Sequence, residues 1–182
     1  TNFVYVEMAN VGAGPGTAHI IANGIRNVDL QWRFIDISGN QMSRSGLNHI
    51  FWAARQNRSL RVLLVGDNGA GSYFGTADDM NLNHGIAVQR AIMANVMIRE
   101  LDLSYNAMSS EAGDNVLKAM LQNHTIRRLS LRGNKIDDSV ADSLFDVLCF
   151  NEVLDEIDIG ENMLGYDCVH VIGDALSENR SL

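Results

Sequence analysis

Proline, cysteine and long apolar runs are scarce in this sequence of 182 residues, which contains one proline and two cysteines, Cys149 and Cys168. Two cysteines cannot form a disulfide framework, and their scarcity favours a reducing compartment. No apolar run approaches the roughly 18–20 residues that a transmembrane helix needs. The N-terminal residues do not have the pattern of a secretory or transit peptide. The sequence therefore predicts a cytoplasmic protein that no membrane span anchors.

Basic residues are also few, because 14 lysines and arginines face 22 aspartates and glutamates, a net charge of −8. Nucleic acids and anionic membranes are bound through a basic surface, so this balance argues against both partners. Apolar residues make up 46% of the chain and charged residues 20%. This composition and length are sufficient for one folded domain over residues 1–182.

A nine-residue pattern recurs along the chain. Residues 98–106 read IRELDLSYN, residues 126–134 IRRLSLRGN and residues 154–162 LDEIDIGEN, with weaker copies at 32–40 and 60–68. The first apolar position of each unit falls at residues 32, 60, 98, 126, 154 and 182, and a degenerate copy starts near Phe3. The spacing between these positions is therefore 28 residues, except for 38 between residues 60 and 98. Such a period indicates a repeat architecture.

Each unit begins with a strand pattern and ends that pattern at an asparagine. The apolar fourth and sixth positions alternate with polar neighbours, as in a short strand with one buried side. The asparagine at the ninth position can bond backbone groups of its own turn and of the adjoining turn. These residues are Asn40, Asn68, Asn106, Asn134 and Asn162.

A helical stripe follows each strand pattern. Apolar residues spaced four apart lie on one face of a helix, and the two slots nearest the next unit hold Ile50 and Ala54, Val88 and Ile92, Val116 and Met120, Leu144 and Leu148, and Ile172 and Leu176. An asparagine stands three residues before each new unit. We expect it to end the helix in the left-handed conformation that helix C-termini often adopt. These asparagines are Asn57, Asn95, Asn123, Asn151 and Asn179.

A strand–turn–helix unit of this length cannot bury its own apolar face and must stack on neighbours. The chain resembles leucine-rich repeat proteins, in particular the helix-containing class typified by ribonuclease inhibitor. The phrases QNRSL (56–60), QNHTI (122–126) and ENRSL (178–182) are similar to those of tropomodulin-type and Nod-like-receptor repeats. The resemblance implies an α/β horseshoe, with a parallel sheet on the concave side and helices on the convex side.

Two irregularities interrupt the regular pattern. Leu182 occupies the first slot of a new unit and neither end has a polar capping unit, so we expect a segment of a longer solenoid with flanking repeats. The 38-residue unit places an insertion at residues 69–79, on the rim where a strand passes to a helix. This insertion contains the adjacent aromatic residues Tyr73 and Phe74.

Several motifs imitate functional sites. The stretch GAGPGT at residues 12–17 with Asp36 about 20 residues later is similar to a dinucleotide-binding fingerprint, but Asp36 belongs to the repeat series, which leaves no doubly wound sheet. The three glycosylation sequons begin at Asn57, Asn123 and Asn179, all at one repeat position, so the repeat itself explains them. Cys168 occupies a small core slot and is interpreted as a buried thiol. We find no catalytic pair, metal site or cofactor site.

Function is predicted to lie on the concave sheet and the neighbouring rim. Side chains between the apolar slots point out of the sheet, and those of the first strands are apolar whereas those of the later strands are charged. Exposed apolar neighbours usually mark a contact surface, although the insertion or a flanking segment folding over them remains an alternative. The candidate partner-binding residues are Phe34, Asp36, Val62, Leu64, Tyr73, Phe74, Glu100, Asp102, Tyr105, Arg128 and Arg132.

The favoured interpretation is a non-catalytic scaffold that binds another protein with a basic or amphipathic surface. The resemblance includes cytoskeletal or axonemal scaffolds, tropomodulin-like actin regulators and the sensing segments of Nod-like receptors. A GTPase-activating domain is the second interpretation, because Ran GTPase-activating proteins share this repeat type and its acidity. A nucleotide-binding enzyme is the third. Fold does not dictate function, so these alternatives stay open on sequence alone.

Overall fold

The computed structural model describes residues 3–69 and 85–179, in which strands and helices alternate. The strands are β1 (Phe3–Glu7), β2 (Gln31–Asp36), β3 (Val62–Leu64), β4 (Glu100–Asp102), β5 (Arg128–Ser130) and β6 (Glu156–Asp158). The helices are α1 (Gly14–Arg26), α2 (Ser43–Ala54), α3 (Ile86–Ala94), α4 (Ser110–Met120), α5 (Ala141–Phe150) and α6 (Tyr166–Glu178), and a short 3-10 helix, η2 (Asp138–Val140), precedes α5. We call each strand with its following helix a repeat.

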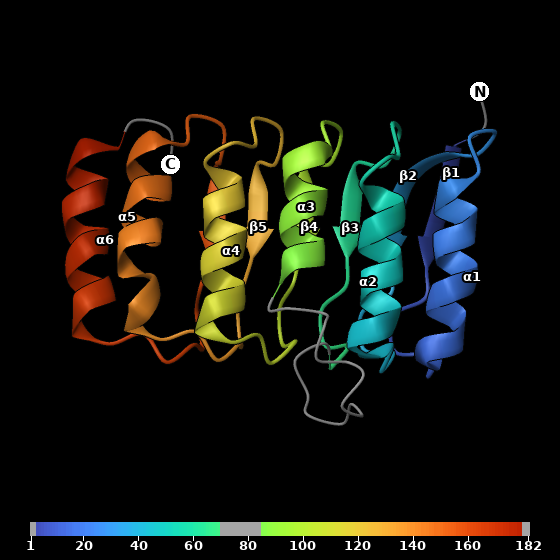
Figure 1. Cartoon of the computed structure of the whole chain (residues 1–182), viewed down its shortest axis with the longest axis horizontal. Helices are drawn as coiled ribbons and strands as arrows, with labels where there is room; N and C mark the ends of the chain where they lie inside the picture. Colours follow the sequence, from blue (N-terminus) through green and yellow to red (C-terminus); the bar gives the residue numbers. More distant parts are fainter. Residues whose placement is uncertain (1–2, 70–84, 180–182) are drawn as a thin grey trace.

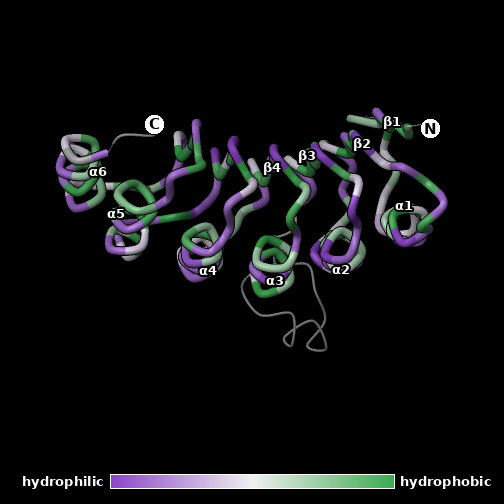
Figure 2. The backbone as a smooth tube through the Cα atoms, turned by 90° about the horizontal axis from the view of Figure 1, so that it is seen from above, coloured by the Kyte–Doolittle hydropathy of each residue, from purple (hydrophilic) through white to green (hydrophobic). Residues whose placement is uncertain are grey.

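The six strands form one parallel sheet in sequence order, β1 to β6. The helices stand side by side in a second layer (Figure 1). Seen along the strands, the two layers bend into an arc with the sheet on its inner side (Figure 2). This arrangement confirms the predicted α/β solenoid. In the described part of the chain no helix is long and apolar enough to span a membrane.

The core lies between the sheet and the helices and is built from the predicted apolar slots. The strand positions Ile35, Leu63, Leu101 and Leu129 and the helix positions Ile50, Val116 and Met120 are buried almost completely. Full burial of such a side chain contributes about 1.5–3 kcal/mol. The helix slots of α6 differ, because Leu176 is 53% exposed where the repeat pattern predicts burial. This side chain lies in the outermost helix, which packs against α5 on one side.

The first strand contains a small adjustment of the repeat. Val4 pairs with Trp32, and a bulge between Val4 and Tyr5 then brings Tyr5 opposite Phe34. The bulge absorbs one residue, so the spacing between the first two units changes from 28 to 29 within the strand. Phe3, near which the degenerate copy was predicted to start, is 44% exposed, and the guanidinium of Arg33 lies 4.1 Å from the centre of its ring.

The asparagines at the ninth position form a ladder that fastens each repeat to the previous one. The Asn68 amide donates to the carbonyls of Ile37, Val65 and Gly66, at 2.9–3.1 Å. Its side-chain oxygen accepts the backbone N–H groups of Asn40 and Met42. The same arrangement recurs at Asn106 and Asn134. The predicted role of this row is confirmed, since one side chain satisfies backbone groups of two successive turns.

The second asparagine row bonds as expected of a helix end, but its predicted conformation is wrong. Asn95 has φ −86° and ψ 128°, and Asn151 has φ −81° and ψ 116°, which is extended and not left-handed backbone. The Asn95 side-chain oxygen accepts hydrogen bonds from the N–H groups of Met97 and Ile98. Its amide donates a hydrogen bond of 2.7 Å to the carbonyl of Ala54 in the preceding helix. With this extended backbone the asparagine bonds both its own turn and the preceding helix.

Candidate protein-binding surface on the concave sheet

The parallel register aligns the outward side chains of the six strands into two rows across the concave face. The first row is Tyr5, Phe34, Val62, Glu100, Arg128 and Glu156. The second row is Glu7, Asp36, Leu64, Asp102, Ser130 and Asp158. Adjacent strands lie about 4.8 Å apart, so the structure brings the predicted sheet residues together on one surface.

The N-terminal half of this surface is apolar in its first row and at Leu64, whereas the second row begins with the carboxylates Glu7 and Asp36. Phe34, Val62 and Leu64 are half-buried, and Tyr5, which stands beside Phe34, is 67% exposed. Sequence reasoning missed Tyr5 because the first unit is degenerate. The alternation of residues 3–7, FVYVE, is the signal that could have revealed it, since it places the tyrosine ring between two inward valines.

The C-terminal half is charged and slightly hollowed. An open hollow is lined by Leu64, Glu100, Leu101, Asp102, Arg128, Leu129, Ser130, Glu156 and Asp158. Arg128 forms an ion pair with Glu100, and the hydrogen bond and charge of Glu100 raise the pKa of the guanidinium. Backbone N–H groups orient two of the carboxylates, because Asp102 accepts from Ser104 at 2.8 Å and Asp158 accepts from Gly160 at 2.9 Å.

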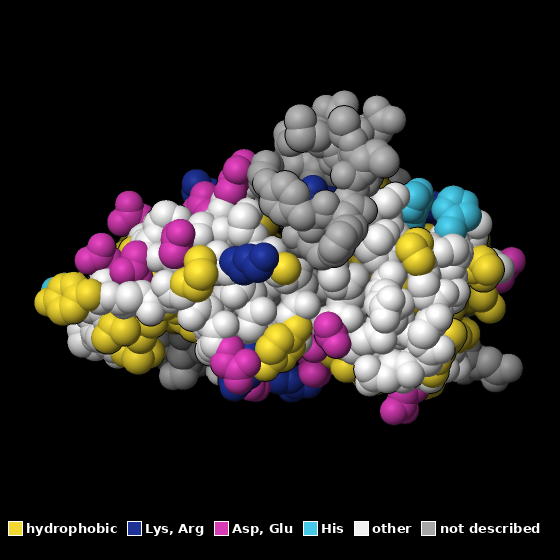
Figure 3. Space-filling view, turned by 90° about the horizontal axis from the view of Figure 1, so that it is seen from below, with side chains coloured by type: hydrophobic (Ala, Val, Ile, Leu, Met, Phe, Trp, Pro, Cys, Tyr) yellow, Lys and Arg dark blue, Asp and Glu magenta, His cyan; other side chains and the backbone are white. Residues whose placement is uncertain are grey.

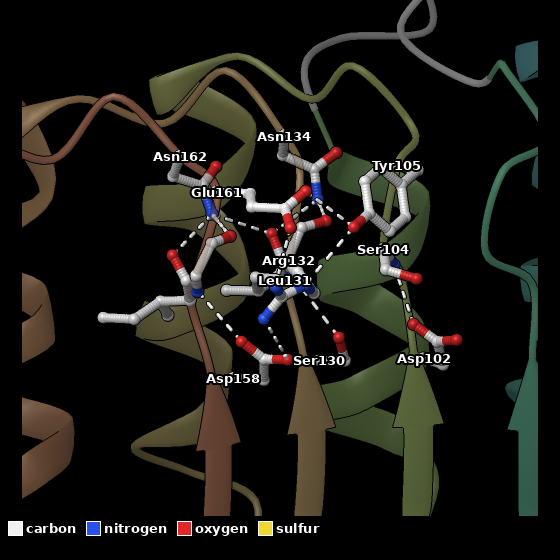
Figure 4. A network of polar contacts seen from close by, with 12 residues as sticks. Asp102, Ser104, Tyr105, Ser130, Leu131, Arg132, Asn134, Asp158, Glu161 and Asn162 are labelled. Atoms are coloured by element: carbon white, nitrogen blue, oxygen red, sulfur yellow. Dashed lines mark hydrogen bonds and ion pairs between the residues drawn. The ribbon is translucent and has the colours of Figure 1, made fainter.

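Three side chains at the adjoining rim form a polar network that we call the rim clamp, consisting of Tyr105, Arg132 and Glu161. The Tyr105 hydroxyl donates to Glu161 at 2.7 Å, and Arg132 donates both to that hydroxyl, at 3.3 Å, and to Glu161, at 2.7 Å (Figure 4). The hydrogen bond from Tyr105 and the pairing with Arg132 lower the pKa of Glu161. Seen from this rim, acidic, basic and apolar side chains gather along the edge of the sheet (Figure 3).

Backbone geometry makes room for the rim clamp. Tyr105, Gly133 and Glu161 occupy the eighth position of three successive repeats and all have a left-handed φ, of 52°, 65° and 54°. A Cβ atom on Gly133 would lie 2.2 Å from the Tyr105 ring, so only glycine lets this ring pass across the middle repeat to Glu161. Glu161 was not predicted as a site residue. Its eighth position in the repeat, which it shares with the predicted site residue Tyr105, was the sequence signal that could have revealed it.

Four units have an arginine at the second position that bonds to the next repeat, namely Arg33, Arg61, Arg99 and Arg127. Arg61 donates 3.1 Å to the carbonyl of Met97, and Arg99 donates 2.9 Å to the carbonyl of Thr125. Burial and the neighbouring charges of Arg33 and Arg99 lower the pKa of Arg61. This row therefore has a structural role along the edge of the sheet.

The remaining motifs have structural explanations in the fold. The glycine-rich stretch forms the turn from β1 into α1, with φ 69° at Gly12 and 68° at Gly14, and Asp36 accepts the N–H of Ser38. Cys168 is fully buried, and burial is the main cause that raises the pKa of its thiol to about 11. Over residues 3–69 and 85–179 there is no group of three or more potential metal-ligating side chains. The insertion aromatics Tyr73 and Phe74 lie outside the described residues.

Comparisons with known proteins agree with this geometry. The family model described as "Leucine Rich repeat" matches residues 94–115 and 122–144. No curated protein matches the sequence significantly. The tropomodulin C-terminal domain of Caenorhabditis elegans has a similar structure, with a TM-score of 0.70 and 15% identity over 89% of this chain and 92% of that chain. The leiomodin-1 actin-binding site 2 domain superimposes with a TM-score of 0.66 and 14% identity over 90% and 87% of the two chains. The repeated strand–turn–helix units and these matches show that the chain has the fold of a leucine-rich repeat solenoid.

Proposed function

We propose that this chain is a non-catalytic scaffold that binds a protein partner across its concave face. The observation that carries the proposal is the ordered change along the first row of the sheet, from Tyr5, Phe34 and Val62 on β1–β3 to Glu100, Arg128 and Glu156 on β4–β6. A row of half-exposed apolar groups favours a contact that excludes water, and the flanking charges orient the partner.

The chemistry of the charged half specifies the kind of partner. Four carboxylates, Glu100, Asp102, Glu156 and Asp158, line the hollow together with one arginine, which is paired with Glu100. The potential over this half is therefore negative. A basic or amphipathic partner segment fits, with its apolar side on β1–β3 and its basic side chains over the carboxylates.

We further propose that the rim contributes to binding through Tyr105 and Arg132 and through the insertion at residues 69–79 with Tyr73 and Phe74. Tyrosine and arginine are frequent energetic anchors of interfaces. In the sequence the insertion follows Asn68, four residues after the strand that presents Val62 and Leu64. Replacing Tyr73 and Phe74 together by serine should weaken binding by about 2 kcal/mol or more, with little change in melting temperature.

Actin is the first partner to test, because one domain of similar fold is named as an actin-binding site. A cytoplasmic, cytoskeleton-associated location would follow from such a partner. The low identity of 14% supports the fold alone, so the surface described here must carry the proposal.

A matched pair of variants tests the concave face. Val62→Glu places a carboxylate in the apolar row, whereas Val96→Glu makes the same change at an exposed position in the loop after α3. Binding to monomeric and filamentous actin should fall about 30-fold or more in Val62→Glu and stay unchanged in Val96→Glu, with both variants folded by circular dichroism. If wild type binds neither form of actin, this partner is wrong. Equal binding of any partner by both variants would refute the concave face as the site.

A further inference from the structure

Two histidines from neighbouring helices meet on the convex side of the molecule, away from the concave surface. The rings of His19 in α1 and His49 in α2 have their centres 4.9 Å apart and their planes at 80°. Histidine side chains lie side by side at the surface in the space-filling view (Figure 3). His19 is exposed and His49 is half-buried, so the pair is accessible from solvent.

The hydrogen bonding of the pair leaves nitrogen atoms available to a ligand. The His49 Nδ1 atom lies 2.9 Å from the carbonyl oxygen of Ser45. A carbonyl can only accept, so we assign the proton to Nδ1, which leaves a lone pair on Nε2. Metal-bound histidines nearly always donate their second ring N–H in this manner. Within the described residues, the His19 ring has no hydrogen-bond partner.

The separation of the rings matches that of two imidazoles on one metal ion. With Zn–N bonds of about 2.0–2.1 Å and about 1.1 Å from a ring nitrogen to the ring centre, two imidazoles at a tetrahedral angle have centres about 5 Å apart. The observed distance of 4.9 Å between the ring centres agrees with this value. Neutral imidazole binds zinc, nickel and copper ions in preference to magnesium or calcium.

We propose that His19 and His49 together bind a divalent transition-metal ion such as Zn²⁺, which links α1 to α2. The two side chains supply two ligands, and water fills the other positions, because the described residues add no third histidine, cysteine or carboxylate to the pair. The site is independent of the proposed protein-binding surface, since it lies in the helix layer.

Calorimetric titration of the untagged protein with Zn²⁺ tests the proposal. Wild type should bind one ion, and both His19→Ala and His49→Ala should weaken binding about tenfold or more. His170→Ala is the matched control, because His170 with Asp174, at 3.9 Å in α6, is the competing surface pair. That variant should bind as wild type does. All three positions are at the surface or half-buried, and thermal unfolding without metal verifies that each variant folds.

A second readout separates an ion shared by both helices from an ion on one histidine. Zn²⁺ should raise the melting temperature of wild type and of His170→Ala but not that of either pair variant, because only binding to the folded site stabilises it. Nitrogen chemical shifts of both His19 and His49 should move at the same Zn²⁺ concentration. Absence of binding, or equal affinity after removal of either histidine, would overturn the proposal and leave a simple ring contact.

Discussion

Replacement of Asn134 by alanine is the sharpest test of the asparagine ladder. The Asn134 amide donates to the carbonyls of Leu131 at 2.7 Å and Leu103 at 3.1 Å, and its oxygen accepts the N–H groups of Asn106 and Met108, both at 3.0 Å. The residue is only 5% exposed. Alanine removes the partner of four backbone groups in two adjoining turns and leaves the space of an amide group behind.

The expected loss follows from these contacts. A buried polar group left without a partner costs about 1–3 kcal/mol, and water that enters the vacated space recovers part of it. Four such groups therefore give a loss of about 3–5 kcal/mol, large for a single substitution. Asn162→Ala is the matched comparison at the outer end of the ladder. The Asn162 amide donates to Leu131 and Ile159, and its oxygen accepts one N–H, from Ile136. Because Asn162 is half-buried, water can replace these partners, so a smaller loss of about 1–2 kcal/mol is expected.

Urea unfolding followed by circular dichroism measures both losses as shifts of the midpoint at constant slope. The adjacent variant Asn134→Asp separates the two halves of the side chain, because a carboxylate can accept the two N–H groups but cannot donate to the carbonyls. It should fall between wild type and alanine or below alanine, never near wild type. A wild-type midpoint for Asn134→Ala, or a greater loss at Asn162, would refute the ladder as a source of stability.

Three further outcomes are expected. Gly133→Ala should lower the melting temperature because its Cβ would meet the neighbouring tyrosine ring at 2.2 Å, whereas Gly173→Ala, where a Cβ meets nothing within 4 Å, should raise stability by about 0.5–1 kcal/mol. The pKa of Cys168 is raised to about 11, so its thiol should resist a disulfide reagent at pH 8 until the protein unfolds, and stability should decline as the pH rises from about 8.5, the usual value for an unfolded thiol, towards 11. Mass spectrometry after secretion from eukaryotic cells should find Asn57 and Asn123 unglycosylated in folded protein, because both are buried and donate to backbone carbonyls at 2.9 and 2.7 Å.

The order and type of the elements could be predicted from the sequence because the period constrains many residues at once. A single apolar residue such as Leu63 could belong to a strand or to a helix. Because Leu101 and Leu129 occupy the same position in later repeats and are buried like Leu63, only a strand at this position fits all three. The parallel register then places Val62 beside Glu100, so the composition of the concave face was also readable.

Two other contacts between repeats were not predictable. The conformation of Asn95 depends on the carbonyl of Ala54 in the preceding helix, a partner that a helix-end rule does not consider. The link from Tyr105 to Glu161 depends on the absence of a side chain at Gly133 between them. In each case the deciding group lies in another repeat, and only the three-dimensional structure brings it within reach.

The rim clamp has a mechanical consequence. Asparagine and arginine contacts join adjacent repeats. The hydrogen bond from Tyr105 to Glu161 joins repeats two apart, so it restrains two junctions between repeats at once. We expect the arc to be stiff from β4 to β6 and more compliant from β1 to β3, so labels on α1 and α3 should show a broader distribution of distances than labels on α4 and α6. A partner whose surface has a different curvature would then bend the sheet at β1–β3. The sheet at β4–β6 would keep its own curvature, so only partners that match it there would bind well.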